Sequence, residues 1–530
     1  MADGPAAARR GRPSAWRATA RRRPAAALAA AGAALALAAA GCAAGPAAHG
    51  TGRRAAVPVV HWQPCSGASQ AGLECGTLRV PLDYARPHGR MITLALSEVP
   101  ATAPASQQLG ILLVNPGGPG ASGTGMASFV AQGLDPSVAA RYDIIGFDTR
   151  GVGQSVPALH CDRSFFARER PNYIPANAAA EKVMENRARA YAADCQRRFG
   201  WLLPYMTTVN IARDMDRIRA ALGRPTLSYL GYSYGTYIGQ VYATLFPHRV
   251  RRMVLDSIVD PTGVWYADNI AQDYAFQERM NAFYAWTARY DRVYRLGATA
   301  AAVRRSWYAM RADLAAHPVA EPPGPAIGPD EFDDTYLAGG YDNGYWPGLA
   351  AAASSYLHGG SAQPLITLFR QVGRQSENEF AVYNAVECAD VNWPRSWARW
   401  NADTRRVYAA APFEAWDNAW FNAACAFWPV HGPARPMRVG APGLPGILMI
   451  QGTLDAATPY GGALNARRRF PTARMVVVAG GGNHGQSLAY PPNACVDGYL
   501  NRYLASGALP GGPGLVNATC PALPPPTPSG

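Results

Sequence analysis

The residue types and spacing that could do chemistry are clearest around Ser233, in the pentapeptide GYSYG at 231–235. An apolar, β-prone run at 226–230 precedes it, and the stretch at 237–246 has the spacing of an amphipathic helix. A serine on a sharp turn from a strand into a helix exposes its hydroxyl above the sheet, where it can attack a carbonyl. The flanking glycines permit the strained backbone of such a turn. An ordinary glycine-rich turn also fits the pattern, so the other catalytic groups decide between the two interpretations.

Candidates for the base and the acid lie in the C-terminal third of the chain. A serine hydroxyl needs a general base, and the base needs an acid that orients it. Asp455 follows the apolar run at 446–452, and His484 lies in a glycine-rich loop after the β-branched run at 475–478. Taken singly, each could be an ordinary loop residue. Together, each after its own strand and in the order serine, acid, histidine, they predict a triad of Ser233, Asp455 and His484.

A second glycine-rich loop, NPGGPG at 115–120, directly follows the apolar run at 111–114. Glycines let backbone N–H groups approach a developing oxyanion without a side-chain clash. We expect the N–H of Gly118 to be one oxyanion donor, with Gly117 as the alternative, and the N–H of Tyr234 to be the other. The loop matches neither GxxxxGKS/T nor GxGxxG, so it does not predict a phosphate site.

Three motifs occur in one chain: NPGGPG at 115–120, FDTRGVGQS at 147–155 and GYSYGT at 231–236. Together they resemble the secreted tripeptidyl aminopeptidases of actinobacteria, in the prolyl-aminopeptidase branch of the α/β-hydrolases. Shorter matching stretches are CGTLRVPLDY at 75–84, CAD at 388–390, CAFWP at 425–429 and QGTLD at 451–455. The resemblance therefore extends over about 62–520.

The resemblance implies that Ser233 is the nucleophile, Asp455 the orienting acid and His484 the general base, and that short peptides are cleaved from a free N-terminus. Asn115 stands where the prolyl-aminopeptidase branch usually has histidine, a departure that favours the tripeptidyl subset. A prolyl aminopeptidase, or an esterase or amidase of the same fold, is the alternative, because a triad does not specify the acyl group. An inactive surface-binding protein on a hydrolase scaffold is disfavoured by the intact catalytic set.

The distribution of these motifs predicts an α/β-hydrolase fold with a helical cap inserted in the core sheet domain. Residues 62–260 alternate strand-like runs with helical stretches, which is typical of the first part of such a core. Residues 261–440 are rich in Trp, Tyr, Ala and Arg and contain helix-like segments, so we expect them to form the cap. Residues 441–520 complete the core, and the proline-rich segment 521–530 is predicted to be disordered.

Residues 1–41 have the composition of a signal peptide. Their arginine-rich start leads into an Ala/Leu run at 25–40 that is too short to span a membrane as a mature helix. The sequence AAGC at 39–42 resembles a bacterial lipobox, which predicts cleavage before Cys42 and lipid attachment there, with ordinary secretion as the alternative. We expect 42–61 to be a flexible tether and the mature chain to be extracellular, touching a membrane only through a lipid on Cys42.

The other cysteines form an even set of eight: Cys65, Cys75, Cys161, Cys195, Cys388, Cys425, Cys495 and Cys520. An even set in an exported chain predicts disulfides, and sequential pairing is the simplest of the many possible connectivities. No C-x-x-C occurs, so no metal site is predicted, and nothing in the sequence calls for an organic cofactor.

The net charge of +13 overstates how basic the mature chain is, because residues 1–41 contain seven arginines and one aspartate. No basic stripe with interleaved aromatic residues is present, so nucleic-acid binding is not expected.

An exopeptidase that cuts at a fixed distance from the N-terminus needs an anionic anchor for the ammonium group of its peptide substrate. Glu387 and Asp390, beside Cys388 and Trp393 in the predicted cap, are the preferred anchor. Other acidic candidates are Glu278, Asp333, Asp334 and Asp342. Surface solvation is the alternative explanation for each of them.

Overall fold

The computed structural model describes residues 59–66, 72–167, 169–322 and 324–528. The predicted signal peptide, Cys42 and residues 42–58 of the predicted tether lie outside the described residues. Among the described helices, none combines the length and the apolar character needed to cross a membrane.

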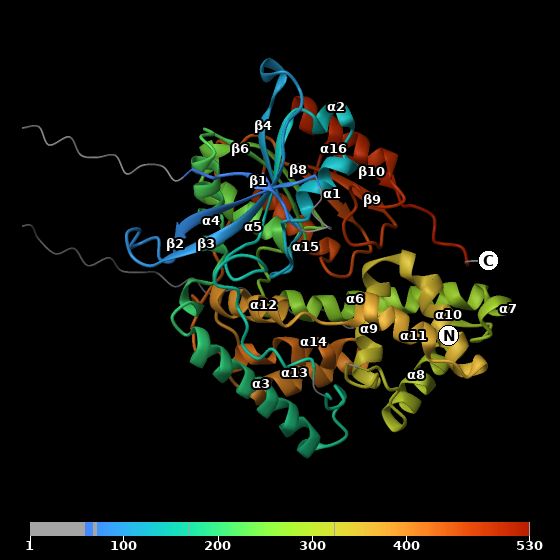
Figure 1. Cartoon of the computed structure of the whole chain (residues 1–530). Coiled ribbons are helices and arrows are strands. Elements are labelled where there is room, and N and C mark those ends of the chain that lie inside the picture. Colours follow the sequence, from blue (N-terminus) through green and yellow to red (C-terminus); the bar gives the residue numbers. More distant parts are fainter. Residues whose placement is uncertain (1–58, 67–71, 168, 323, 529–530) are drawn as a thin grey trace, which may run out of the picture. The chain divides into compact units, whose positions relative to one another are not determined.

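The core is a ten-stranded sheet in the order β1-β2-β3-β5-β4-β6-β7-β8-β9-β10 (Figure 1). The strands are β1 (Gln63–Pro64), β2 (Glu74–Pro81), β3 (Met91–Val99), β4 (Gly110–Asn115), β5 (Tyr142–Phe147), β6 (Leu227–Tyr232), β7 (Val250–Asp256), β8 (Leu448–Gly452), β9 (Arg474–Ala479) and β10 (Ala518–Pro521). Pairing is antiparallel from β1 to β5 along the sheet and parallel from β5 to β10. The parallel strands are buried on both faces, which explains why β4, β6 and β8 have near-continuous apolar sequences.

Helices cover both faces of the sheet because successive strand residues point to opposite sides. Leu113 of β4 belongs to one apolar cluster, and Leu112 and Val114 belong to another. The first cluster includes residues of α4 (Thr208–Ala221), α5 (Tyr234–Leu245) and α15 (Tyr460–Arg469). The second includes residues of α1 (Met126–Gly133), α2 (Pro136–Ala139) and α16 (Ala494–Ser506).

A helical insertion separates β7 from β8. Its helices are α6 (Tyr266–Arg289), α7 (Asp291–Tyr294), α8 (Ala300–Ala316), α9 (Pro329–Tyr341), α10 (Trp346–Gly359), α11 (Gln363–Leu368), α12 (Glu377–Asp390), α13 (Trp397–Ala410) and α14 (Ala415–Asn422). The insertion has an aromatic core of its own, in which the ring centroids of Trp286 and Trp346 lie 5.7 Å apart. Figure 1 shows these helices gathered on one side of the sheet.

Helix α3 (Ala178–Phe199) packs with the insertion although it precedes it by many residues. The side chain of Asn177 accepts the N–H of Ala180 and begins this helix. Met184 on its buried face contacts an apolar cluster that contains Trp416 and Trp420 of α14. The apolar face of α3 is buried against α14 of the insertion. The cap therefore includes α3 in addition to helices of the segment 261–440.

The eight described cysteines form four disulfides, and the pairing is sequential: Cys65–Cys75, Cys161–Cys195, Cys388–Cys425 and Cys495–Cys520. This is the pairing that the sequence predicts as the simplest. Structural disulfides form and persist in oxidising compartments, so the four pairs are consistent with the predicted extracellular location.

The C-terminal segment differs from the prediction of disorder at 521–530. The structure describes the chain as far as residue 528, and the indole N–H of Trp286 donates a hydrogen bond to the Pro526 carbonyl at 2.8 Å. A buried indole N–H needs an acceptor, and a proline carbonyl can supply one although proline has no N–H to donate. The proline-rich tail thus runs from β10 to helix α6 of the insertion and contacts that helix through this hydrogen bond.

Candidate active site

Ser233 lies on the turn between β6 and α5 with φ 54° and ψ −129°, a conformation that is strained for a residue with a side chain. The two glycines of GYSYG make this turn possible. A Cβ on Gly231 would lie 2.6 Å from the carbonyl oxygen of Gly235, and a Cβ on Gly235 would lie 2.9 Å from the carbonyl oxygen of Asn115. The Ser233 N–H donates to the Asp256 carbonyl at 3.0 Å, which holds the turn on the neighbouring strand.

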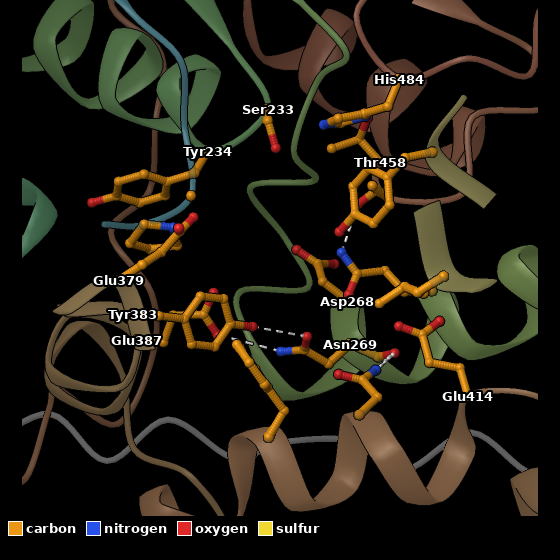
Figure 2. Close-up of a pocket in the computed structure, with 18 of the residues that line it drawn as sticks. Ser233, Tyr234, Asp268, Asn269, Glu379, Tyr383, Glu387, Glu414, Thr458 and His484 are labelled. Carbon is orange, nitrogen blue, oxygen red and sulfur yellow. Dashed lines mark hydrogen bonds between the residues drawn. The ribbon is translucent and has the colours of Figure 1, made fainter. Parts of the chain in front are cut away.

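His484 and Asp455 meet at the same edge of the sheet, each on a loop after its own strand. The His484 Nδ1 lies 2.9 Å and 3.0 Å from the two carboxylate oxygens of Asp455. The Asp455 Oδ1 also accepts the N–H groups of Ala457 and Thr458, at 3.1 Å and 3.2 Å. Figure 2 shows the His484 ring extending toward Ser233, whose hydroxyl points into a cavity. The structure thus brings the three predicted residues together.

The electrostatics around His484 favour its protonated form. Burial opposes protonation of the ring, but the Asp455 carboxylate outweighs this effect, and the pKa of His484 is raised above its ordinary value. The backbone N–H of His484 donates to the Tyr341 carbonyl at 2.7 Å, and the two rings meet edge to face at 5.5 Å. A residue of helix α9 in the insertion therefore fixes the position of the histidine.

Asp256, the last residue of β7, holds the loop that follows His484 and was not singled out by the sequence. Its carboxylate accepts the N–H groups of Gln486 and Ser487, at 3.0 Å and 2.7 Å, and the Ser487 hydroxyl at 2.5 Å. The side chain is fully buried, and burial raises its pKa to about 6. The only signal in the sequence is an aspartate at the end of an apolar run. An aspartate with a purely structural role has the same pattern, so the signal is not specific.

The loop after β4 lies directly against the serine turn. A Cβ on Gly117 would come within 2.7 Å of the Tyr232 carbonyl oxygen and 2.8 Å of the Ser233 Cβ. The N–H of Gly117 donates to the Asn115 side chain at 3.0 Å, which favours Gly118 as the oxyanion donor.

The N–H groups of Gly118 and Tyr234 have no hydrogen-bond partner among the described residues, and both residues line the cavity beside Ser233. Tyr234 is the first residue of α5, where backbone N–H groups have no acceptor within the helix. Two unpaired donors beside the serine suit a developing oxyanion.

The cavity has a volume of about 530 Å³ and lies between Ser233 and the helical insertion. Carboxylates dominate its charged lining: Asp260, Asp268, Asp334, Glu379, Glu387, Glu414 and Asp417. The cationic side chains along it are limited, within the described chain, to Arg374 and the ionisable His484. This lining is suited to a cationic ligand.

Glu387 and Asp390, the predicted anchor, have different surroundings. Glu387 lines the cavity and is 3% exposed, and the Asn269 side-chain amide donates to it at 3.4 Å. Asp390 does not line the cavity. Its carboxylate accepts the N–H and the hydroxyl of Thr208, at 2.8 Å and 2.5 Å, at the start of helix α4. The structure therefore does not place Asp390 beside Glu387 in the cavity wall, because its carboxylate is bonded to the start of a core helix.

A metal site is not evident in the described part of the chain, where no group of three or more His, Cys, Asp or Glu residues could hold an ion. The fold and the site together define a serine hydrolase of the α/β-hydrolase fold.

Comparison with known proteins agrees with this class and narrows it. Residues 110–489 match the alpha/beta hydrolase fold family. The chain is 40% identical to a tripeptidyl aminopeptidase of Streptomyces lividans, over 86% of each chain. It is 32% identical to the serine protease Hip1 of Mycobacterium tuberculosis, over 85% of this chain and 89% of that one. It is also 32% identical to a carboxylesterase B of the same species, over 87% of this chain and 91% of that one. The chain belongs to the tripeptidyl aminopeptidase family of α/β-hydrolases.

Proposed function

We propose that this protein is a serine exopeptidase that releases short peptides, most often tripeptides, from free N-termini through an acyl-enzyme. The observation that carries the proposal is the carboxylate-lined cavity that begins at Ser233. A serine with a base cleaves many acyl compounds, but a cavity lined by acids favours substrates that carry a positive charge.

The chemistry follows from the proposed roles. The Ser233 hydroxyl attacks the scissile carbonyl while the His484 imidazole takes its proton, and Asp455 stabilises the imidazolium. The N–H groups of Gly118 and Tyr234 bind the oxyanion of the tetrahedral intermediate. The imidazolium then protonates the leaving amine, and the acyl group stays on Ser233. Water, deprotonated by His484, hydrolyses this ester and releases the peptide.

The ammonium group of the substrate is proposed to bind Glu387 together with Asp268. Both side chains line the cavity, and Asp268 has a carboxylate oxygen, Oδ2, without a hydrogen-bond donor among the described residues. Burial raises the pKa of both carboxyl groups well above the ordinary range. An ammonium group between them would restore their charged forms, because an opposite charge at close range favours ionisation.

Chromogenic amides with one, two or three residues before the scissile bond test this proposal. We expect the tripeptidyl amide with a free amine to be cleaved fastest, and acetylation of the amine to lower kcat/KM by at least about tenfold, since a hydrogen-bonded charge is lost. Glu387→Gln should lower kcat/KM for the free amine and narrow the difference from the acetylated substrate. Equal cleavage of free and blocked amides would contradict an exopeptidase.

An esterase is the second candidate, because one relative is named carboxylesterase B. A short-chain ester in the same assay separates the two functions. Hydrolysis of the ester without cleavage of any peptide amide would favour the esterase. Fastest cleavage of a single-residue prolyl amide would favour a prolyl aminopeptidase.

Activity should depend on pH through His484. The base must be neutral to accept the serine proton, and the pKa of His484 is raised above its ordinary value. We therefore expect kcat/KM to be full above that raised pKa and to fall as the pH drops through it, with a midpoint above the ordinary histidine value of about 6.5. A pH profile of kcat/KM with a neutral substrate measures this. A midpoint well below 6.5 would contradict a close Asp455–His484 pair.

We further propose that the extracellular protein is anchored by a lipid on Cys42. The AAGC sequence at 39–42 supports this proposal, which concerns residues outside those that the structure describes. Partition of the protein into the detergent phase, abolished by Cys42→Ala, is the expected result; release into the medium with Cys42 intact would contradict it.

A further inference from the structure

The cavity has a second acidic region at the start of helix α14, apart from the proposed ammonium anchor. Glu414, which immediately precedes the helix, and Asp417 in its first turn both line the cavity. Figure 2 shows the Glu414 carboxylate pointing into the cavity, across it from Glu387 and Tyr383. The two acidic regions belong to different helices, so they form separate walls of the same cavity.

Glu414 lacks the partner that a buried carboxylate needs. Its side chain is only 7% exposed, and its Oε2 has no hydrogen-bond donor among the described residues. Neither Glu414 nor Asp417 forms an ion pair with any Lys, Arg or His of the described chain. Leaving a buried carboxylate unpaired is costly, and here the open side of the group faces the cavity. The missing donor would therefore come from a ligand.

Nearby cations are already engaged elsewhere. Arg170 pairs with Glu331 and Asp334, both at 2.8 Å. Burial, with the carboxylates of Asp273 and Asp417 close by, raises the pKa of Glu414 well above its ordinary value. If Glu387 and Asp268 hold the substrate ammonium, Glu414 and Asp417 have no ion-pair partner of their own among the described residues.

We propose that Glu414 and Asp417 form a second cation-binding subsite, which takes the side chain of a lysine or arginine within the released peptide. This inference rests on the proposed function. Leu337 and Phe421 also line the cavity and supply apolar surface for the methylene stem of such a side chain. The ammonium or guanidinium head then donates to the Glu414 Oε2 and to the Asp417 carboxylate.

Tripeptidyl amides with a free amine test the subsite when one residue at a time is changed among lysine, norleucine and alanine. Norleucine keeps the lysine stem and lacks its charge. With the wild-type enzyme, we expect one position of the substrate at which lysine gives a kcat/KM about ten- to a hundredfold higher than norleucine. This is the size of effect expected for a hydrogen bond to a charged group. Equal rates at every position would overturn the proposal.

Three variants locate the effect. Glu414→Gln should bring the lysine-to-norleucine ratio close to one, and Asp417→Asn, which also serves if Glu414→Gln does not fold, should lower it. Glu387→Gln should slow both substrates alike and leave the ratio unchanged. Glu278, one of the acidic candidates of the sequence, lies at an exposed position of α6 and does not line the cavity. Glu278→Gln is therefore the control and should alter neither rate. Loss of the ratio in Glu387→Gln but not in Glu414→Gln would overturn the assignment.

Binding of tripeptides to Ser233→Ala, measured by calorimetry, keeps the subsite separate from the proposed reaction. Tighter binding of the lysine peptide than of the norleucine peptide, lost on adding Glu414→Gln, supports the subsite even if no amide is cleaved. If no amide is cleaved, that result would contradict only the proposed exopeptidase activity. If both peptides bind equally well, that result would contradict only the proposed subsite.

Discussion

Replacing Ser233 with alanine is expected to lower kcat for a tripeptidyl amide by about a millionfold, which is the size of effect known for the nucleophile of a serine peptidase. The reason is that no other group can form the acyl-enzyme at this turn. Removing the hydroxyl deletes the attacking atom and leaves His484 and the two oxyanion donors in place. Substrate should still bind, because the carboxylates of the cavity are unchanged.

The matched control is Ser228→Ala on the same strand, β6. Ser228 is 1% exposed, and its hydroxyl has no hydrogen-bond partner among the described residues, so alanine removes only an unsatisfied polar atom. We expect Ser228→Ala to keep full activity and to unfold at a similar or slightly higher temperature. A comparable loss in both variants would mean that the strand, and not the Ser233 hydroxyl, determines the rate. Activity of Ser233→Ala within tenfold of the wild type would remove Ser233 from the mechanism.

The catalytic loops could be predicted from the sequence because each lies within a few residues of its own strand. Parallel strands end at the same edge of a sheet, so an acid after β8 and a histidine after β9 must approach a serine after β6. Local patterns therefore sufficed to predict that Ser233, Asp455 and His484 lie on loops at the same edge of the sheet. Their approach also depends on the order of β6, β7, β8 and β9 within the sheet, which the order of the residues along the chain does not specify.

The wall of the cavity could not be predicted in this way. Glu387 and Asp390 lie three residues apart on α12, a spacing that puts two side chains close together on a helix surface. Asp390 is the last residue of that helix, and Thr208 of the core takes up its carboxylate. Which acid faces the cavity depends on how helices far apart in the sequence pack, and helical periodicity does not contain this information.

The same limit applies to Asp256 and to Glu414. Each is an ordinary acid residue next to apolar residues, and its role appears only when a distant segment is brought beside it. The Asp256 carboxylate accepts hydrogen bonds from the backbone N–H groups of Gln486 and Ser487. The Glu414 Oε2, in contrast, has no hydrogen-bond donor among the described residues. Two buried carboxylates thus differ: Asp256 holds a loop through hydrogen bonds, and the Glu414 Oε2 is left without a donor among the described residues.

Asp455→Asn is expected to lower kcat by about ten-thousandfold with little change in KM, since the same change has an effect of that size in the serine–histidine–aspartate triad of an unrelated fold. The backbone decides how the new amide is oriented. The N–H groups of Ala457 and Thr458 donate to the Asp455 Oδ1, so the asparagine must present its carbonyl oxygen to them and its NH2 group to His484. An amide N–H facing Nδ1 forces the imidazole proton onto Nε2, and the ring can then no longer accept the serine proton.

Loss of the carboxylate also changes the titration of the ring. The Asp455 charge is what raises the pKa of His484 against the effect of burial, so in Asp455→Asn that pKa should fall. The residual activity should accordingly persist to lower pH than in the wild type, which a pH profile of the variant can measure. Asp83→Asn is the control, because the Asp83 carboxylate lies in a surface turn, where it accepts the Ala85 N–H and pairs with the exposed side chain of Arg86. A loss smaller than tenfold in Asp455→Asn, with an unshifted profile, would transfer the orienting role to the other buried carboxylate beside the histidine loop, Asp256.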